Sequence, residues 1–127
     1  MSGLNVALIG APNAGKSSLF NTLSGSHQKV ANYPGVTVER RSGLITTESG
    51  HTVKLIDLPG IYSLNDRSLD ETVSREVITG EHEFETQPDV LVCVINASNI
   101  RVHLRLVLEL KLLGLPMIVA LNMHDLA

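Results

Sequence analysis

The 127-residue chain contains no tryptophan, a single cysteine and only 3% aromatic residues. A core without aromatic bulk is built from Val, Ile and Leu, the residues of buried parallel strands and of the helices that cover them, so the composition favours an α/β fold. A lone cysteine excludes an intrachain disulfide. Cys93 stands in the apolar run of residues 90–95, which predicts a small buried side chain.

An excess of positive charge and a long hydrophobic run are also missing. The formal net charge is −3, so no broad basic face is available to neutralise a nucleic-acid backbone, and RNA or DNA is not expected as the main partner. The longest apolar stretches fall well short of the ~20 residues that span a bilayer, and nothing at the N-terminus resembles a signal peptide. The chain by itself is therefore expected in the cytosol, as one domain of ordinary size.

Apolar runs alternate with helical patterns along the chain. Residues 24–38 are mostly polar and contain glycine and proline, which predicts a long irregular loop. Glu48, Ser49 and Gly50 separate two strands and predict a tight antiparallel hairpin. The expected strands are residues 4–9, 39–47, 51–57, 89–97 and 115–121, and the expected helices are residues 16–23, 68–80 and 98–113.

This alternation predicts a mostly parallel sheet with one antiparallel strand, right-handed crossovers and helices on both faces. Ser68 followed by Glu71 resembles a capping box that opens the second helix, and Gly114 is the expected C-cap of the third. In sheets of this kind, ligands bind outside the carboxyl ends of the strands. The motifs described next all fall at that edge.

A phosphate-loop motif lies between the first strand and the first helix: two glycines separated by four residues and followed by Lys-Ser. A mere glycine turn is the alternative. The glycines let backbone N–H groups wrap a β-phosphate, and the helix N-terminus adds a partial positive charge. Lys16 supplies a full charge between the β- and γ-phosphates, and Ser17 offers its hydroxyl to magnesium. The predicted phosphate-binding residues are Gly10, Ala11, Pro12, Asn13, Ala14, Gly15, Lys16, Ser17 and Ser18.

A second nucleotide motif, Asp57-Leu58-Pro59-Gly60, stands at the end of a strand. In this motif the aspartate holds magnesium through water and the glycine N–H meets the γ-phosphate. Alone, the tetrapeptide also describes an ordinary turn, but here it follows a phosphate loop. Thr37, in the loop before the hairpin, is placed to give magnesium a second hydroxyl only when the γ-phosphate is present, which makes that loop a switch.

The third motif, Asn122-Met123-His124-Asp125, also stands at a strand end. Its asparagine and aspartate have the spacing of the guanine-reading motif, in which the carboxylate accepts from N1–H and from the 2-amino group of guanine. Adenine presents neither donor, so GTP is favoured over ATP. Met123 replaces the more usual lysine, and its long apolar stem can pack on the same surface.

Three stretches, residues 32–39, 57–64 and 122–125, make the whole chain resemble the N-terminal G domain of the ferrous-iron transporter FeoB, a Ras-like P-loop GTPase domain. The resemblance implies GTP binding with magnesium, slow hydrolysis to GDP, and control of ferrous-iron uptake at the cytosolic face of the cell membrane. In that family the G domain continues into a last strand, helix and guanine loop, and then into helical and membrane domains. Residues 1–127 are therefore expected to be a C-terminally truncated G domain, whose candidate partners are those domains and further copies of itself.

The resemblance also implies how the attacking water and the developing charge are handled. Ile61 stands where Ras-like GTPases carry the glutamine that orients the water, and an alkyl side chain cannot do so. Backbone groups are then implied to hold the water, with a potassium ion bound by Asn13 and by the carbonyls of Ala31 and Tyr33. The nucleotide-contacting residues assigned to the switch loop are Gly35, Val36, Thr37, Val38 and Glu39, and catalytic roles are assigned to Lys16, Asn13, Thr37 and Gly60.

Several alternatives stay open at the level of sequence. Ile61 can be a mere packing residue in a domain that has lost hydrolysis, and Asn13 can be a plain turn residue. A soluble RNA- or ribosome-associated GTPase would share this core but usually carries a basic appendage, and a nucleotide-sensing module would bind without turnover. The five histidines do not pair at metal-binding spacing, so no iron site is predicted. Arg40 and Arg41, beside the switch, can reach a phosphate, but they are expected to be solvated strand residues.

Overall fold

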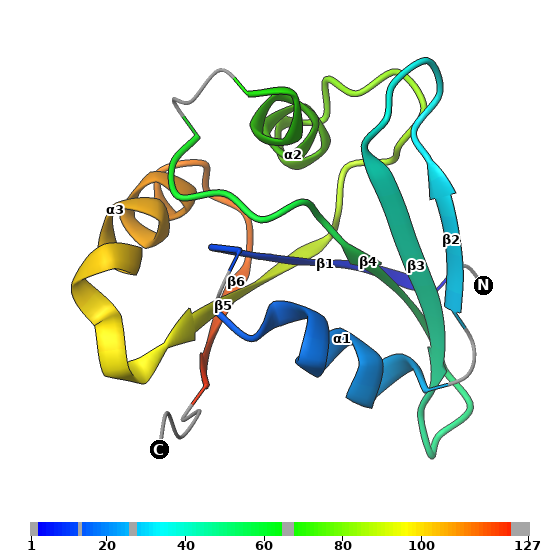
Figure 1. The fold of residues 1–127 in the computed structure, drawn as a ribbon. Helices are drawn as coiled ribbons and strands as arrows, with labels where there is room; N and C mark the ends of the chain where they lie inside the picture. Colours follow the sequence, from blue (N-terminus) through cyan, green and yellow to red (C-terminus); the bar gives the residue numbers. More distant parts are fainter. Residues whose placement is uncertain (1–2, 13, 26–27, 65–67, 123–127) are drawn as a thin grey trace.

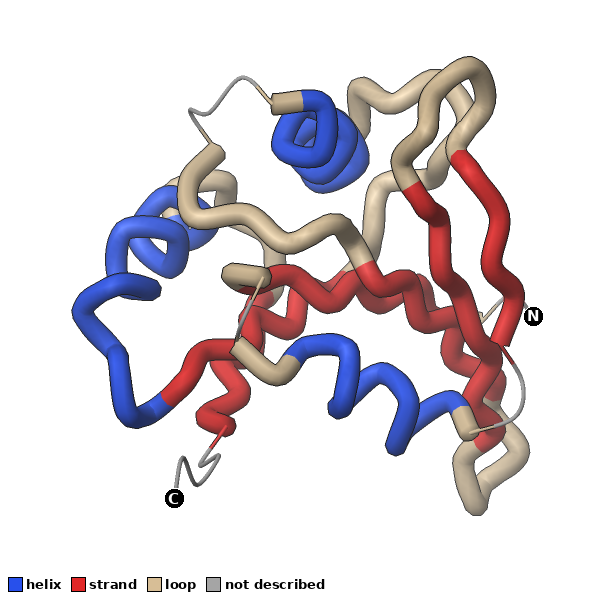
Figure 2. The backbone as a smooth tube through the Cα atoms, viewed as in Figure 1, coloured by secondary structure: helices blue, strands red, loops and turns tan. Residues whose placement is uncertain are grey.

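A computed structural model describes residues 3–12, 14–25, 28–64 and 68–122 (Figures 1 and 2). The strands and helices are β1 (Leu4–Gly10), α1 (Lys16–Ser24), β2 (Gln28–Asn32), β3 (Glu39–Thr46), β4 (Thr52–Asp57), α2 (Leu69–Thr79), β5 (Val90–Asn96), a short 3-10 turn (Ala97–Asn99), α3 (Ile100–Lys111) and β6 (Met117–Asn122). The strands form one sheet in the order β2-β3-β4-β1-β5-β6. β3 runs antiparallel to both neighbours and every other neighbouring pair is parallel, which confirms the predicted sheet.

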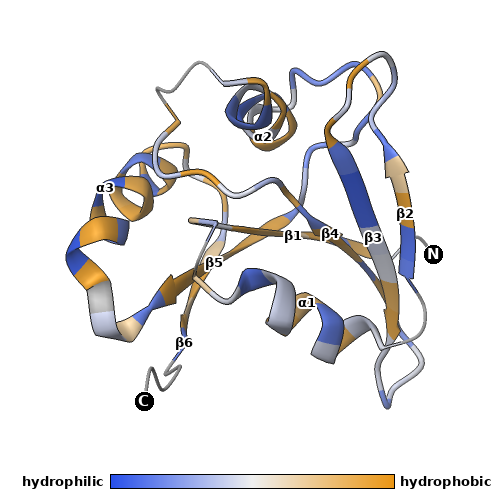
Figure 3. Ribbon diagram, viewed as in Figure 1, coloured by the Kyte–Doolittle hydropathy of each residue, from blue (hydrophilic) through white to orange (hydrophobic). Residues whose placement is uncertain are grey.

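Helices cover both faces of the sheet because neighbouring strand residues point to opposite sides. Leu8 packs in a cluster with Phe20 of α1. Ile9 and Cys93 pack in the opposite cluster, with Leu110 of α3 and residues of α2. Figures 1 and 3 show α1 on one face, α2 and α3 on the other, and apolar colouring along β1 and β5 between them. Burying a Leu, Ile or Phe side chain completely stabilises the fold by about 1.5–3 kcal/mol.

The carboxyl ends of the parallel strands bring the three predicted motifs to one edge. β1 ends at Gly10 and β4 ends at Asp57, with Leu8 paired directly to Asp57. β6 ends at Asn122, opposite Asn96 of β5. The phosphate loop, the Asp57–Gly60 motif and Asn122 therefore share the edge at which ligands bind in such sheets.

β2 is a strand that the sequence does not reveal. The sequence predicts a loop over residues 24–38, but Gln28–Asn32 pair antiparallel with β3 at the edge of the sheet. Four of these five residues are exposed, so β2 lacks the alternation of buried and exposed side chains on which a strand prediction depends. The main chain of β3 supplies its hydrogen bonds instead. Residues 33–38 are an irregular loop, as predicted.

The predicted helix ends are formed largely as the sequence indicates. The Ser68 hydroxyl accepts a hydrogen bond from the Glu71 N–H, with 3.2 Å between Oγ and N, and such a cap contributes about 1 kcal/mol. Gly80 ends α2 with a φ of 81°, and Gly114 follows α3 with a φ of 78°. Among the described residues, no helix combines the length and the apolar character needed to cross a membrane.

Candidate nucleotide-binding site

The phosphate loop joins β1 to α1 through two glycines whose missing side chains the fold requires. A Cβ on Gly10 would lie 2.5 Å from the carbonyl oxygen of Val94, so β5 could not approach β1 as closely. Gly15 has a φ of +90°, and a Cβ there would lie 1.7 Å from Nδ2 of Asn122. Between them the Ala14 N–H donates to the Ala11 carbonyl at 3.1 Å. α1 begins directly after this loop, and the first N–H groups of a helix have no partner within the helix and can bind a phosphate.

Asn122 joins the phosphate loop to the end of β6. Its side-chain Nδ2 donates to the carbonyl of Ala14 at 3.0 Å. The sequence predicts only a contact of this asparagine with guanine, and it gives no sign of this link because the two residues are 108 positions apart. Asn122, Gly15 and Ser18 also line a cleft of 280 Å³ between α1 and β6, which places three predicted nucleotide residues beside one another.

Lys16 and Asp57 form a buried ion pair at the centre of the edge. Lys16 Nζ contacts Oδ1 of Asp57, and the two residues are only 7% and 5% exposed. Two charges taken out of water in this way require a partner of opposite sign. A bound phosphate could replace Asp57 as the negative partner of Lys16, and a bound cation could replace Lys16 as the positive partner of Asp57.

A cleft of 340 Å³ surrounds this ion pair, a volume at the lower end of the range for small-molecule sites. It brings together the predicted lysine and the three predicted magnesium ligands. Asp70 and Arg41 also line it. The sequence gives no sign of a role for Asp70, and it favours a solvated side chain over a phosphate contact for Arg41. The full lining is Lys16, Ser17, Thr37, Val38, Glu39, Arg41, Asp57, Leu58, Pro59 and Asp70.

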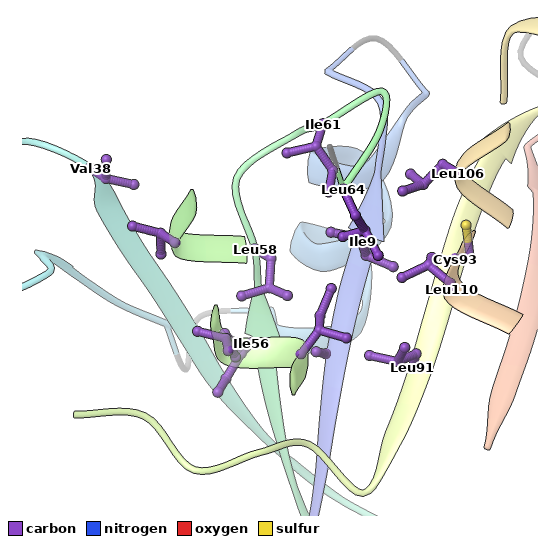
Figure 4. Close-up of a cluster of buried hydrophobic side chains, with 14 of the residues drawn as sticks. Ile9, Val38, Ile56, Leu58, Ile61, Leu64, Leu91, Cys93, Leu106 and Leu110 are labelled. Carbon is purple, nitrogen blue, oxygen red and sulfur yellow. The ribbon is translucent and has the colours of Figure 1, made fainter. Parts of the chain in front are cut away.

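The segment after β4 runs directly against the phosphate loop. The Ile61 N–H donates to the Gly10 carbonyl at 2.8 Å, and a Cβ on Gly60 would lie 2.7 Å from Cα of Pro12. Ile61 itself is fully buried. Figure 4 shows it in the apolar cluster beside Leu64, so its side chain packs in the core instead of reaching toward the cleft.

The loop of residues 33–38 holds Thr37 at the cleft through a buried tyrosine. The Tyr33 N–H donates to the Val38 carbonyl at 2.9 Å, and the Tyr33 carbonyl accepts from Val36 at 3.2 Å. The tyrosine ring is 2% exposed and meets His82 edge to face at 5.2 Å. Burial, and secondly the charge of Glu85, raise the pKa of Tyr33.

Arg40 differs from the solvated side chain that the sequence predicts. Its Nε donates to Oε2 of Glu85 at 2.6 Å and its Nη2 donates to Oε1 at 3.1 Å. Glu85 is 7% exposed, and the hydrogen bond to it is the main reason why the pKa of Arg40 is raised. This bidentate pair anchors the segment between α2 and β5 on β3.

The predicted potassium ligands Ala31 and Tyr33 are not among the described residues that line the cleft around Lys16. Ala31 lies in β2, opposite Arg40. Gly35 has a φ of +78°, at the tip of the switch loop. Four predicted residues lie outside the described residues, namely Asn13, Met123, His124 and Asp125.

Comparison with known proteins identifies the family. The family model described as ferrous iron transport protein B matches residues 4–127. The chain is 48% identical over 127 residues to the Fe(2+) transporter FeoB of Escherichia coli, covering 100% of this chain and 16% of that protein. It is 45% identical over 122 residues to an Fe(2+) transport protein A/Fe(2+) transporter FeoB fusion protein of Porphyromonas gingivalis, covering 96% of this chain and 14% of that protein.

Two solved structures extend the likeness to the fold. A crystal structure of the G domain of the T. maritima FeoB iron transporter aligns with a TM-score of 0.85 at 42% identity, covering 96% of this chain and 73% of that chain. A crystal structure of a GDP-bound mutant of the S. thermophilus FeoB G domain aligns with a TM-score of 0.84 at 42% identity, covering 94% of this chain and 44% of that chain. The chain therefore belongs to the FeoB family, and it corresponds to the N-terminal G domain of that family, with the fold of a P-loop GTPase.

Proposed function

We propose that this chain binds guanine nucleotide with magnesium and slowly hydrolyses GTP, as the switch domain of a ferrous-iron transporter. The observation that carries the proposal is the convergence of Lys16, Ser17, Thr37 and Asp57 around one cleft. The likeness to a GDP-bound FeoB G domain supports the choice of nucleotide. The names of the relatives, Fe(2+) transporters, support the choice of transported ion.

The donor set at the cleft fits magnesium. Ser17 and Thr37 bring hydroxyl oxygens and Asp57 brings a carboxylate, which are the hard oxygen ligands that this ion prefers. When bound, magnesium would neutralise charge on the phosphate oxygens. Lys16 would then leave Asp57 and pair with the β- and γ-phosphates, while the N–H groups at the start of α1 hold the β-phosphate.

Hydrolysis is in-line attack of water on the γ-phosphate, with the Gly60 N–H hydrogen-bonded to a γ-phosphate oxygen. Ile61 cannot orient the water because its side chain is buried in the core. The water must instead be held by backbone groups, which supports a slow reaction. Thr37 already lines the cleft, but it would give its hydroxyl to magnesium only when the γ-phosphate is present. The loop of residues 33–38 would thereby sense the nucleotide.

Guanine would be selected by the motif that begins at Asn122. The link from its amide to Ala14 sets the end of β6 against the phosphate loop, so a base bound beyond β6 would lie near the phosphates. Asp125 is the proposed acceptor for N1–H and the 2-amino group. Met123 and His124 complete the motif.

We further propose that potassium supplies the charge that an arginine finger supplies elsewhere. Asn13 and the carbonyls of Ala31 and Tyr33 are the proposed ligands. Because neither residue lines the cleft around Lys16, both the end of β2 and the loop of residues 33–38 would have to change position when GTP binds. Phosphate release should be ~10-fold faster in potassium than in sodium, and Asn13→Ala should remove the difference. Equal rates in the two salts for the parent protein would leave Asn13 as a turn residue.

The link to transport is also proposed. Because the chain spans 16% of the length of its Escherichia coli relative, we propose that a last strand, helix and guanine loop complete the G domain, which then joins helical and membrane domains. Exposed apolar side chains on β6, Ile118 at 58% and Leu121 at 57%, support such a covering segment. The domain would act at the cytosolic face of the membrane, and further copies of the protein are candidate partners.

Replacing Lys16 tests the proposed site. Lys16→Ala removes the charge that faces two phosphates and should weaken binding of a fluorescent GTP analogue at least tenfold, which is about 1.4 kcal/mol. Lys111→Ala removes an equal charge at the exposed end of α3 and should leave binding unchanged. Equal affinity of the Lys16→Ala and parent proteins would refute the phosphate-loop assignment.

A further inference from the structure

We infer that Glu109 on α3 is a positioning residue for GTP hydrolysis, because its carboxylate holds the segment that follows Gly60. The inference rests on the proposed function and concerns a residue outside the nucleotide motifs. Oε1 of Glu109 accepts a hydrogen bond from the Leu64 N–H at 2.7 Å. The Ser63 hydroxyl donates to the same carboxylate, with 3.0 Å between Oγ and Oε2. Glu109 thus binds two consecutive residues that are 45 and 46 positions away from it.

The same segment is fixed at its other end. The Ile61 N–H donates to the Gly10 carbonyl at 2.8 Å, and the Ser74 hydroxyl donates to the Pro59 carbonyl at 2.9 Å. Gly60 therefore lies in a short stretch whose two ends are both held, one by β1 and α2 and the other by α3. We therefore expect the loss of the hydrogen bonds from α3 to shift the Gly60 N–H, the group proposed to meet the γ-phosphate.

Leu64 is held from two helices at once. While Glu109 accepts from its N–H, Arg75 of α2 donates from Nη1 to its carbonyl at 3.3 Å. Its side chain lies in the same apolar cluster as Leu106 of α3 and Ile61, which Figure 4 shows together. The main chain and the side chain of Leu64 thus both hold the segment in place against α3.

The charge of Glu109 suits this role. Its side chain is 19% exposed and accepts a further bond from Arg105, one turn earlier on α3, at 3.1 Å. Partial burial pushes the pKa of Glu109 upward, but the bonds from the Leu64 N–H, Arg105 and Ser63 together outweigh it, so the pKa lies below its ordinary value. The carboxylate is therefore ionised at neutral pH, and its hydrogen bonds are of the stronger, charge-assisted kind.

The test is Glu109→Gln in the full-length protein, a change that keeps the shape and removes the charge. We expect kcat for GTP to fall about tenfold, because a small misplacement of a catalytic group is costly, while GDP affinity stays within about twofold. Glu76→Gln makes the same chemical change on α2 and should leave kcat as in the parent. Ser63→Ala removes a donor from the segment itself and should lower kcat in the same direction. The double variant should then lose less than the product of the two single effects.

The outcomes separate this inference from the proposed function. A parent protein without GTP turnover would overturn the proposed function, and the inference with it. A parent that hydrolyses GTP, with folded Glu109→Gln at the parental kcat, would overturn the inference alone. An equal loss of GDP affinity and kcat would also overturn it, since Glu109 would then support only the fold. Should Glu109→Gln fail to fold, an unchanged kcat in Ser63→Ala would refute the inference by itself.

Discussion

At the scale of single residues, a glycine sets how closely the switch segment after β4 approaches the phosphate loop. Gly60 passes Pro12 with no room for a side chain, since a Cβ would lie 2.7 Å from Cα and 2.8 Å from N of that proline. Both neighbours are main-chain atoms, so neither can turn aside. Only a glycine at position 60 allows the segment after β4 to lie this close to the phosphate loop.

Gly60→Ala should therefore push the switch segment away from the phosphate loop. We expect a loss of about 1–3 kcal/mol in the free energy of unfolding, typical of overpacking, and a larger relative loss of GTP turnover than of GDP affinity. Urea unfolding and nucleotide titration measure the two effects. Gly50→Ala is the control for a glycine substitution that strains the backbone without a clash. Gly50 has a φ of +87°, and a Cβ there would meet no atom within 4 Å. Parental turnover in Gly60→Ala would contradict the assigned contact with the γ-phosphate.

At the scale of elements, the segment between α2 and β5 supports the switch loop. Glu85 in this segment binds Arg40 of β3 through both carboxylate oxygens, and His82 packs on Tyr33. The switch loop is therefore held by a part of the chain that carries no nucleotide motif.

Glu85→Gln should loosen this support. Arg40 would lose its ionised partner, and the protein should lose about 2 kcal/mol of stability, as for other hydrogen bonds to charged groups. Because the chain has no tryptophan and only two tyrosines, tyrosine fluorescence reports whether Tyr33 becomes exposed to solvent. Glu48→Gln on the hairpin turn is the control for the change in charge. Unchanged stability and fluorescence in Glu85→Gln would show that Tyr33 is held by other contacts.

Elements with a local signature could be predicted, and those that depend on distant partners could not. The phosphate loop can be recognised from eight consecutive residues, and the helix cap at Ser68 from four. β2 has no such signature because its edge position leaves its side chains exposed. The contact of Glu109 with Leu64 was equally hidden, since the amphipathic pattern of α3 tells which side chains are buried but not which carboxylate meets a distant loop.

At the scale of the whole molecule, the sheet explains why motifs far apart in sequence form one site. A parallel sheet delivers each strand end to the same edge, so residues near positions 16, 57 and 122 become neighbours without any local pattern joining them. The order of the strands decides which motifs touch. Because β1 lies between β4 and β5, the phosphate loop receives the Asp57–Gly60 segment from one side and, beyond β5, the end of β6 from the other.

Stability of the whole fold should depend on pH through one buried histidine. His103 on α3 is 3% exposed, and its Nδ1 has no hydrogen-bond partner among the described residues. Burial disfavours the charged ring and lowers the pKa of His103 below 6.5. Between that lowered pKa and 6.5, the unfolded chain binds a proton that the folded chain does not. The contribution of His103 to the free energy of unfolding is therefore fully present above pH 6.5 and is lost as the pH drops below it. Glu109, whose pKa is lowered from 4.5, adds its own loss only at lower pH.

The measurement is the urea midpoint of the parent and of His103→Gln at several pH values from about 7.5 to 5.5, a window set by the ordinary pKa of histidine. The parent should lose stability across this window, and His103→Gln should show a shallower slope, whatever its stability at the upper end. His51→Gln, in the exposed hairpin turn, is the matched control and should follow the parental slope. If His103→Gln loses stability as steeply as the parent, protonation of other groups must unfold the domain, and the buried ring of His103 is not its acid-sensitive point.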